Sequence, residues 1–205
     1  MAKILTKSRP APRQTRHLAG KNLEPTPGCY VFTSELGAIS LAWHGESLTG
    51  ISIGHASEAE ALTVFTARGA KPTSEAPEFI LSLAERLRCY AAGRSADDFR
   101  DIPLDLAHLS PFQKRVVERC RRITQGRTRT YGELAALAGS PGAARAVGNV
   151  MANNRFPIIV PCHRVVGAAG SLGGFSAPQG TRLKLAMLTR EGAQPTKPSR
   201  PRKAR

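Results

Sequence analysis

The chain has 205 residues, 41% of them hydrophobic, so it can build one large or two small domains with apolar cores. Its net charge is +15, and no apolar stretch approaches the roughly 18 residues of a membrane-spanning helix. The N-terminus also lacks the apolar run of a secretion signal. We therefore expect a cytoplasmic protein with no membrane segment, associated with the nucleoid if its source is bacterial.

The four cysteines are widely separated, at Cys29, Cys89, Cys120 and Cys162. None belongs to a C-x-x-C pair, which argues against both a zinc knuckle and a disulfide framework. We therefore predict that no metal is bound, that no cofactor is needed and that Cys162 stays reduced.

The positive charge is unevenly distributed. Residues 1–22 hold six basic and no acidic residues, and residues 192–205 hold five basic and no acidic ones. Residues 23–105 have a net charge of −6, whereas residues 106–191 have a net charge of +10, so a polyanion should bind the C-terminal half. The tails contain few apolar residues, and we predict that they are disordered. They either hold nucleic acid non-specifically or are simply solvated.

Residues 23–105 predict a small antiparallel sheet with helices. Apolar runs separated by turn residues predict three strands, at 30–32, 38–43 and 48–53. Two helices should follow at 58–68 and 77–92, the second with an apolar stripe made by Phe79, Ile80, Leu83, Leu87 and Tyr90. This segment shows no catalytic constellation. The predicted organisation is a basic arm (1–22), an N-terminal α/β domain (23–105), a C-terminal domain (106–192) and a basic tail (193–205).

Residues 106–192 predict a mostly helical domain. Ser110 and Pro111 are typical of a helix start, with the serine as N-cap, and this helix should run to about residue 123. Thr130 stands three residues before Glu133, as in a capping box, and predicts a second helix that ends at Gly139. The packed face of this second helix should consist of Leu134, Leu137 and Ala138.

A third helix should begin at Ser140-Pro141 and run through Met151. Two short helices joined by a tight glycine-containing turn suggest a helix-turn-helix, although any packed helical hairpin has the same pattern. Arg145 is the only long side chain in the first turns of the third helix, and it is either a DNA contact or a solvated arginine. Its neighbours are small: Ala143, Ala144, Ala146 and Gly148. This surface lacks base-reading side chains and suits a minor groove better than a major groove.

The most informative motif is the run Pro161-Cys162-His163-Arg164-Val165-Val166. It follows the apolar residues 156–160, which predict a short buried strand that delivers the Cys-His pair to its end. An imidazole beside a thiol can take its proton, directly or through a water, and so produce a thiolate nucleophile near neutral pH. The alternative is a buried structural cysteine next to a satisfied core histidine.

Four segments together carry a resemblance to a known family: TYGELA at 130–135, GAARAVG at 142–148, the Asn153-Asn154 pair and PCHRVV at 161–166. Over residues 110–192 the chain resembles the O6-alkylguanine-DNA alkyltransferases, also called methylated-DNA-protein-cysteine methyltransferases. The resemblance implies an α/β (α+β) fold, with a small N-terminal antiparallel sheet and helices. The C-terminal domain would be mostly helical, with a helix-turn-helix and a short strand carrying the active-site cysteine.

The resemblance implies a DNA-repair methyltransferase that acts once per molecule. Duplex DNA containing O6-alkylguanine would be bound through its minor groove, and the damaged base would be flipped out of the helix. Cys162 would take the alkyl group irreversibly. Arg145 would fill the gap in the base stack, and Tyr131 would crowd the phosphate and supply a proton to the leaving guanine. Close approach to the DNA is expected at Ala143, Ala144 and Gly148.

The resemblance also assigns the residues around the nucleophile. Asn154 would organise the turn beside Cys162, and Glu191 would orient His163, as the carboxylate does in a catalytic triad. Pro157 and Phe175 would line the alkyl pocket, and Val165 and Ser176 would contact the base. Phe175 stands where many members of the family have tyrosine, which leaves the tolerated alkyl size open.

Three other classes of function compete with repair. A binding-only alkyltransferase-like protein would recognise the lesion without a nucleophile, commonly with tryptophan in its place, and Cys162 argues against it. A helix-turn-helix regulator is disfavoured because its recognition helix would have almost no base-reading side chains. A Cys-His hydrolase does not explain the basic C-terminal half. We expect a monomer that acts on double-stranded DNA.

Overall fold

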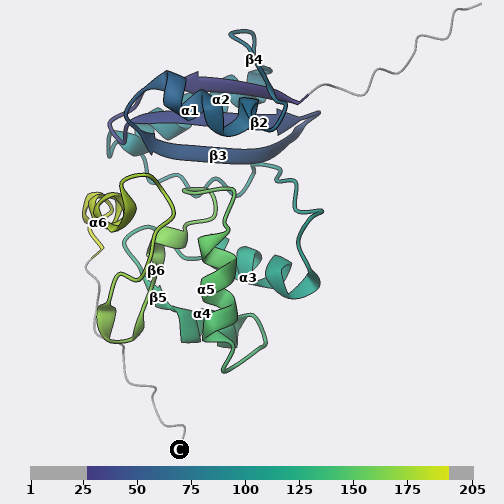
Figure 1. The fold of residues 1–205 in the computed structure, drawn as a ribbon. Coiled ribbons are helices and arrows are strands. Elements are labelled where there is room, and N and C mark those ends of the chain that lie inside the picture. The colour runs from purple at the N-terminus through teal and green to yellow at the C-terminus, as the bar shows by residue number, and fades with distance from the viewer. Residues whose placement is uncertain (1–26, 194–205) are drawn as a thin grey trace, which may run out of the picture.

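The computed structural model describes residues 27–193, and Figure 1 shows a sheet with two helices above a mostly helical half. The α/β class predicted from the sequence is confirmed. The predicted basic arm and the basic tail beyond Ala193 lie outside the described residues. Within residues 27–193, no helix is both long and apolar enough to cross a bilayer.

The sheet consists of β1 (Gly28–Phe32), β2 (Ala38–His44), β3 (Ser47–His55) and β4 (Lys71–Pro72). The first three strands form the predicted antiparallel meander. The short β4 was not predicted, and it pairs parallel to β1, so the order is β3-β2-β1-β4 and the sheet is mixed. Two residues that include a proline show no alternating pattern, which explains why the sequence gives no sign of this strand.

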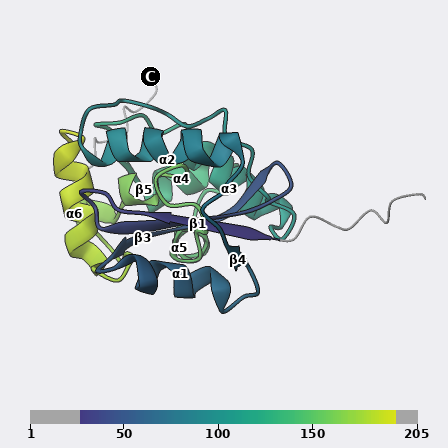
Figure 2. The same cartoon turned by 90° about the horizontal axis from the view of Figure 1, so that it is seen from above.

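Helices α1 (Glu58–Thr66) and α2 (Glu78–Ala91) lie on opposite sides of the sheet, as Figure 2 shows. Both were predicted to within two residues at each end. α1 buries Ala61 and Phe65. α2 buries most of the predicted stripe, namely Ile80, Leu83, Leu87 and Tyr90, and leaves Phe79 partly exposed.

The helical half contains four α-helices, two short 3-10 helices and two short strands. In chain order these are α3 (Pro111–Arg121), β5 (Arg129–Thr130), α4 (Tyr131–Leu137), α5 (Ala144–Ala152), η1 (Cys162–Arg164), β6 (Val165–Val166), η2 (Ala168–Gly170) and α6 (Gly180–Arg190). β5 and β6 pair in parallel. α4 and α5 form the predicted helix-turn-helix.

The two helix starts that were predicted at Ser110 and Thr130 have the expected capping geometry. The Ser110 hydroxyl accepts from the Gln113 amide at 3.4 Å, and the Gln113 side chain accepts from the Ser110 amide at 2.8 Å. The Thr130 hydroxyl accepts from the Glu133 amide at 3.1 Å, and the Glu133 carboxylate accepts from the Thr130 amide at 2.7 Å. Each pair satisfies two backbone donors that the helix itself cannot pair.

The predicted start of the third helix was wrong. Residues 140–143 form a turn closed by a hydrogen bond from the Ala143 amide to the Ser140 carbonyl, and α5 begins only at Ala144. Gly142 has a φ of +88°, a left-handed conformation that glycine adopts without strain and that a helix cannot contain. The Ser140-Pro141 pair therefore belongs to a turn and does not start the helix.

The predicted strand before Cys162 was also wrong. Ile158 has a φ of +76°, which no strand contains, and the Val160 amide closes a turn on the Phe156 carbonyl at 2.8 Å. Pro157 within this run and Pro161 directly after it have no amide hydrogen for a strand ladder. Cys162 therefore lies in the 3-10 helix η1, and the short strand β6 follows the nucleophile instead of carrying it.

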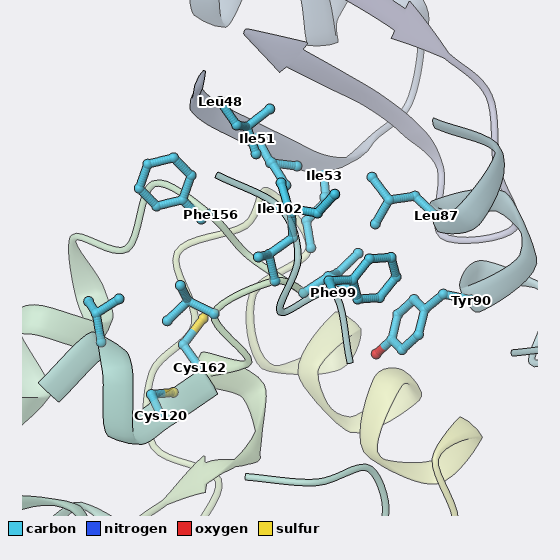
Figure 3. Packing of buried hydrophobic residues seen from close by; sticks show 14 of the residues in the cluster. Leu48, Ile51, Ile53, Leu87, Tyr90, Phe99, Ile102, Cys120, Phe156 and Cys162 are labelled. Carbon is cyan, nitrogen blue, oxygen red and sulfur yellow. The ribbon is translucent and has the colours of Figure 1, made fainter. Parts of the chain in front are cut away.

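One apolar cluster spans the sheet and the helical half. Figure 3 shows Leu48, Ile51 and Ile53 of β3 packed in the same cluster as Cys120 and Cys162. Backbone hydrogen bonds join the halves as well, because the Ile51 amide donates to the Arg155 carbonyl at 2.7 Å. The domain division between residues 105 and 106 stays a prediction, and the two halves share a core.

Replacement of Leu134 in α4 by alanine should lower the free energy of unfolding by about 2–5 kcal/mol, because this side chain is 0% exposed and a cavity would remain. Leu137 was predicted to pack beside it, but it is 50% exposed. Leu137→Ala is therefore the matched control, with an expected change of about 0.5 kcal/mol or less. Urea denaturation measures both, and equal losses would contradict this packing.

Candidate active site

Cys162 lies in a tight turn that Asn154 organises. The Asn154 side-chain amide donates to the Val160 carbonyl at 2.9 Å and to the Cys162 sulfur at 3.1 Å. Its side-chain oxygen accepts from the Phe156 amide at 3.0 Å. One side chain thus fixes the turn and places a hydrogen-bond donor on Sγ.

The Cys162 side chain is only 7% exposed, and burial raises the pKa of its thiol above the ordinary value. The hydrogen bond from Asn154 and the positive charge of Lys184 act in the opposite direction, because both favour the thiolate. The raised pKa keeps the sulfur protonated at neutral pH. A proton acceptor is therefore required before Cys162 can act as a nucleophile.

His163 and Glu191 form a buried pair. His163 Nε2 lies 2.8 Å from Glu191 Oε1, and neither side chain is exposed. Burial alone would raise the pKa of Glu191, but hydrogen bonds from His163 and Arg164 outweigh it and bring this pKa down to about 2. Glu191 is thus ionised at neutral pH and can only accept hydrogen bonds.

The ionised Glu191 determines where His163 carries its proton. Because the carboxylate only accepts, the imidazole must donate through Nε2, which leaves Nδ1 as the basic nitrogen of the neutral ring. Burial lowers the pKa of His163, so the neutral form predominates near pH 7. Nδ1 is buried and has no hydrogen-bond partner among the described protein atoms. The histidine next to Cys162 therefore has a free proton acceptor.

Three buried side chains of the site were not predicted from the sequence. Tyr90 of α2 donates its hydroxyl to Glu191 Oε1 at 2.7 Å, and its oxygen lies 3.3 Å from His163 Nε2. Arg164 binds both carboxylate oxygens of Glu191, each at 2.8 Å. The Lys184 ammonium donates to the Val165 carbonyl at 2.6 Å. A tyrosine on an apolar stripe and a lysine on a helix look like ordinary structural residues, so only the fold reveals them.

A cavity of about 300 Å³ opens beside α5 and reaches Cys162. Its walls include Tyr131, Gly148 of α5, and Phe175 and Ser176 of the loop before α6. Tyr131 is half-buried, and burial raises the pKa of its hydroxyl, so that this group carries its proton at neutral pH. The nucleophile is thus reached from the small-residue face of the helix-turn-helix.

A smaller cavity of about 90 Å³ adjoins Cys162 on the side of the sheet. Pro157, Phe175 and Ser176 line it together with Ile51 and Ile53 of β3. The Ser176 hydroxyl donates to the Ala152 carbonyl at 2.7 Å, which ties this loop to the end of α5. The sheet half therefore supplies one wall of the site.

Val165, which was predicted to contact the base, lines neither cavity. Its side chain is 0% exposed within the core, and its carbonyl accepts from Lys184. The reason is the pairing of β6 with β5, which fixes Val165 opposite Arg129 and leaves its side chain inside the helical half. The contact of Val165 with the base stays a prediction, and its buried side chain does not favour it.

The exposed surface of α5 is nearly free of large side chains. Arg145 is exposed, whereas Ala143 and Ala144 are partly exposed and leave the backbone accessible. A Cβ atom added at Gly148 would meet nothing within 4 Å. This face of the helix can therefore approach another surface closely, with Arg145 as its one long projection in the first turns.

A protein-family model matches residues 111–193 of the chain. Its description is "6-O-methylguanine DNA methyltransferase, DNA binding domain". A methylated-DNA–protein-cysteine methyltransferase of Mycobacterium bovis is 37% identical over 158 residues, which cover 77% of this chain and 88% of the relative. The chain belongs to the methylated-DNA–protein-cysteine methyltransferase family.

Two further comparisons bear on the site. The solved structure of Mycobacterium tuberculosis OGT in complex with DNA has a TM-score of 0.66 and 36% identity, and the match covers 80% of this chain and 92% of that one. A Thermus thermophilus protein named DNA base-flipping protein is 45% identical over 114 residues, 55% of this chain and 74% of that relative. The fold is therefore similar to that of a solved structure in complex with DNA, and the sequence is similar to that of a protein named for base flipping.

The ionised Glu191 should contribute to the loss of stability in acid. Folding lowers this pKa from an ordinary value near 4.5 to about 2, so the carboxylate stabilises the fold above about pH 4.5 and loses this effect as the pH falls towards 2. Glu191→Gln should cost on the order of 3 kcal/mol near pH 7, with the deficit shrinking below pH 4.5. Urea denaturation across this range measures the difference between the two proteins.

The control for this prediction is Glu118→Gln, because Glu118 is 61% exposed in a surface pair with Arg122. Such pairs contribute roughly 0–1 kcal/mol. A constant deficit for Glu191→Gln from pH 7 to pH 3 would show that the carboxylate charge is not what stabilises the site.

Proposed function

We propose that this protein repairs O6-alkylguanine in double-stranded DNA by moving the alkyl group onto Cys162, once per molecule. The observation that carries the proposal is the cavity that leads from the small-residue face of α5 to the Cys162 sulfur. Membership of the methylated-DNA–protein-cysteine methyltransferase family supports the same reaction. We infer that the protein acts as a monomer, in the cytoplasm, without metal or cofactor.

The target base must leave the duplex before the reaction, because a rigid protein cannot reach a paired guanine with a buried thiol. The small residues of α5 allow its backbone to approach the minor groove, where few sequence-specific contacts are available. Arg145 would fill the gap that the flipped base leaves. Tyr131, at the start of α4 and in the cavity wall, would keep the nucleotide rotated outward.

The thiol proton would pass to His163 Nδ1, directly or through a water. The imidazolium that forms would be stabilised by Glu191, which accepts from Nε2 at 2.8 Å. Asn154 and Lys184 favour the thiolate that remains. The buried pair thus provides a general base, and Glu191 fixes the tautomer that makes it one.

The transfer is a single displacement at the alkyl carbon. A carbon–sulfur bond to Cys162 forms while the bond from that carbon to O6 of guanine breaks, and the electron pair of the broken bond stays with the purine. The guanine would take up one proton from Tyr131, and the proton that the thiol gave to His163 would return to the Tyr131 oxygen through water, so that no proton is gained or lost overall. The thioether has no route to hydrolysis here, and the protein is used once.

The small cavity on the sheet side of Cys162 would hold the alkyl group. Pro157 and Phe175 supply apolar surface, and Ser176 lies where it can contact the base. A volume of about 90 Å³ admits short alkyl chains more readily than an aromatic ring. Binding-only lesion recognition is the second candidate function, and the placement of Cys162 at the cavity favours chemistry over binding alone.

Incubation with duplex DNA that contains radiolabelled O6-methylguanine should leave close to one label per protein molecule, attached at Cys162. Cys162→Ala should abolish the transfer and leave DNA affinity within about 2-fold, because no charge changes. Intact-mass measurement and peptide mapping locate the label. Turnover with excess substrate, or release of the label to water, would rule out single-use transfer, and DNA binding without any transfer would favour the binding-only function.

Arg145→Ala should slow repair in duplex DNA by at least 10-fold, because the gap left by the flipped base would stay unfilled. Reaction with free O6-alkylguanine should change little, since no base stack has to be opened. Single-turnover rates on both substrates give the comparison. Arg119→Ala, another exposed arginine of the helical half, is the control, and equal slowing of both reactions by Arg145→Ala would remove its role in the stack.

A further inference from the structure

A larger groove continues from the two cavities at Cys162. It has a volume of about 640 Å³ and lies between β3, the start of α3 and the end of α5. Asn154 and Ser176 line both this groove and the small cavity at Cys162, and Ala152 lines both the groove and the cavity beside α5. The groove therefore begins where the nucleotide cavity ends, and it leads towards the sheet half.

The charged side chains that line this groove are basic. They are Arg68, just beyond α1, and Arg155, just beyond α5, and the ionisable His108 lies beside them ahead of α3. No acidic side chain lines the groove. Among the described residues, neither Arg68 nor Arg155 has an ion-pair partner. We name this region, defined by Arg68, His108 and Arg155, the basic groove.

The surroundings of His108 show how close these charges are to one another. Burial lowers the pKa of His108, and the charge of Arg155 lowers it further; Asp105 acts in the opposite direction, and Lys114 adds a smaller lowering effect. Positive charges that outnumber the negative charges around them repel one another and destabilise the free protein. An anion in the groove would relieve this repulsion.

Arg68 belongs to the acidic half of the chain, which has a net charge of −6 over residues 23–105. Three of the six basic residues of that segment, Arg86, Arg88 and Arg100, have acidic partners. Arg68 instead lines a groove shared with the basic helical half. Two features oppose this positive charge: the carboxylate of Asp105 near His108, which does not line the groove, and the C-terminal end of α5, whose partial negative charge is at most about half a unit.

We propose that the basic groove holds the phosphodiester backbone of the DNA strand that carries the flipped nucleotide. The strand leaves the cavity beside α5 past Ala152, which also lines the groove, and its next phosphates would lie between Arg68 and Arg155. The sheet half would then bind DNA directly, in addition to the helix-turn-helix. This inference rests on the proposed repair function, since it places the strand by the nucleotide that enters the cavity.

The test is the salt dependence of binding to a duplex that contains one O6-methylguanine. Each phosphate neutralised by a cation contributes roughly 0.9 to the slope of log affinity against log salt concentration. Arg68→Ala with Arg155→Ala should therefore reduce the slope by about 1.8 and weaken binding by 10-fold or more at low salt. The double lysine variant at the same two positions should keep the slope of the original protein.

The matched control is Lys71→Ala with Arg94→Ala, which also removes two positive charges from the sheet half but outside the groove. Its slope should change by less than about 0.5, because neither residue lines the groove where the phosphates would lie. Duplexes shortened on one side or the other of the lesion form a second arm. The difference in slope between the original protein and the double alanine variant should disappear for one of the two shortened duplexes, namely the one that no longer reaches the groove.

The outcomes separate this inference from the repair function. The double alanine variant, the control and the original protein could have equal slopes while transfer to Cys162 stays intact. This result would overturn the binding of DNA phosphates in the basic groove and leave the repair function standing. A loss of slope that persists on both shortened duplexes would also overturn it, because the charges would then act from a distance. Binding of inorganic phosphate in the groove with unchanged DNA slopes would assign it to a free anion instead. Absence of any transfer from O6-methylguanine DNA by the original protein would reject the repair function itself.

Discussion

The candidate active site depends on one buried carboxylate. Glu191 Oε1 accepts hydrogen bonds from His163, Tyr90 and Arg164, and Oε2 accepts a further one from Arg164. A carboxylate with a side chain that is 0% exposed would be neutral or strongly destabilising without such partners. The donors come from α2 and from η1, while Glu191 follows α6, and Arg164 also donates to the Ile123 carbonyl after α3 at 2.6 Å. The site is therefore assembled only when four distant segments are packed together.

Burial of the nucleophile has a second consequence. With its pKa raised by burial, the Cys162 thiol is protonated at rest and resists oxidation and unwanted alkylation, since the thiolate is the reactive form. The same burial strengthens every charge interaction within the site, because little water remains to screen it. A bound base would exclude water further, so the donors from Asn154 and Lys184 would favour the thiolate most strongly when the alkyl carbon is in place. Reactivity would thus be coupled to the presence of the lesion.

Local sequence signals predicted most helices and strands correctly. The turn before Cys162 and the buried partners of His163 were missed because they depend on contacts between residues far apart in the sequence or on the packing of the core. The capping boxes at Ser110 and Thr130 involve residues three apart, so the sequence contains all the information they need. The turn at Ile158 does not follow from local preference, because its left-handed backbone is held by Asn154 and by the core on both sides. Tyr90 lies 73 residues from its histidine partner, and nothing in a helical stripe distinguishes a buried tyrosine that packs from one that also donates. The family motif placed Cys162, His163 and Asn154 together, but the support around them is a property of the fold.

The sheet half has no nucleophile, yet the site is incomplete without it. Ile51 and Ile53 of β3 form one wall of the cavity next to Cys162, and Tyr90 of α2 donates to the carboxylate that orients His163. The negative charge of this half also has a physical role, because a polyanion is repelled by it and attracted by the helical half, which orients the protein as it approaches DNA. Because the sheet half completes the cavity at Cys162, it has to share one core with the helical half. If they were loosely joined, neither the distance of 2.7 Å from the Tyr90 oxygen to Glu191 nor the orientation of the charge would be maintained.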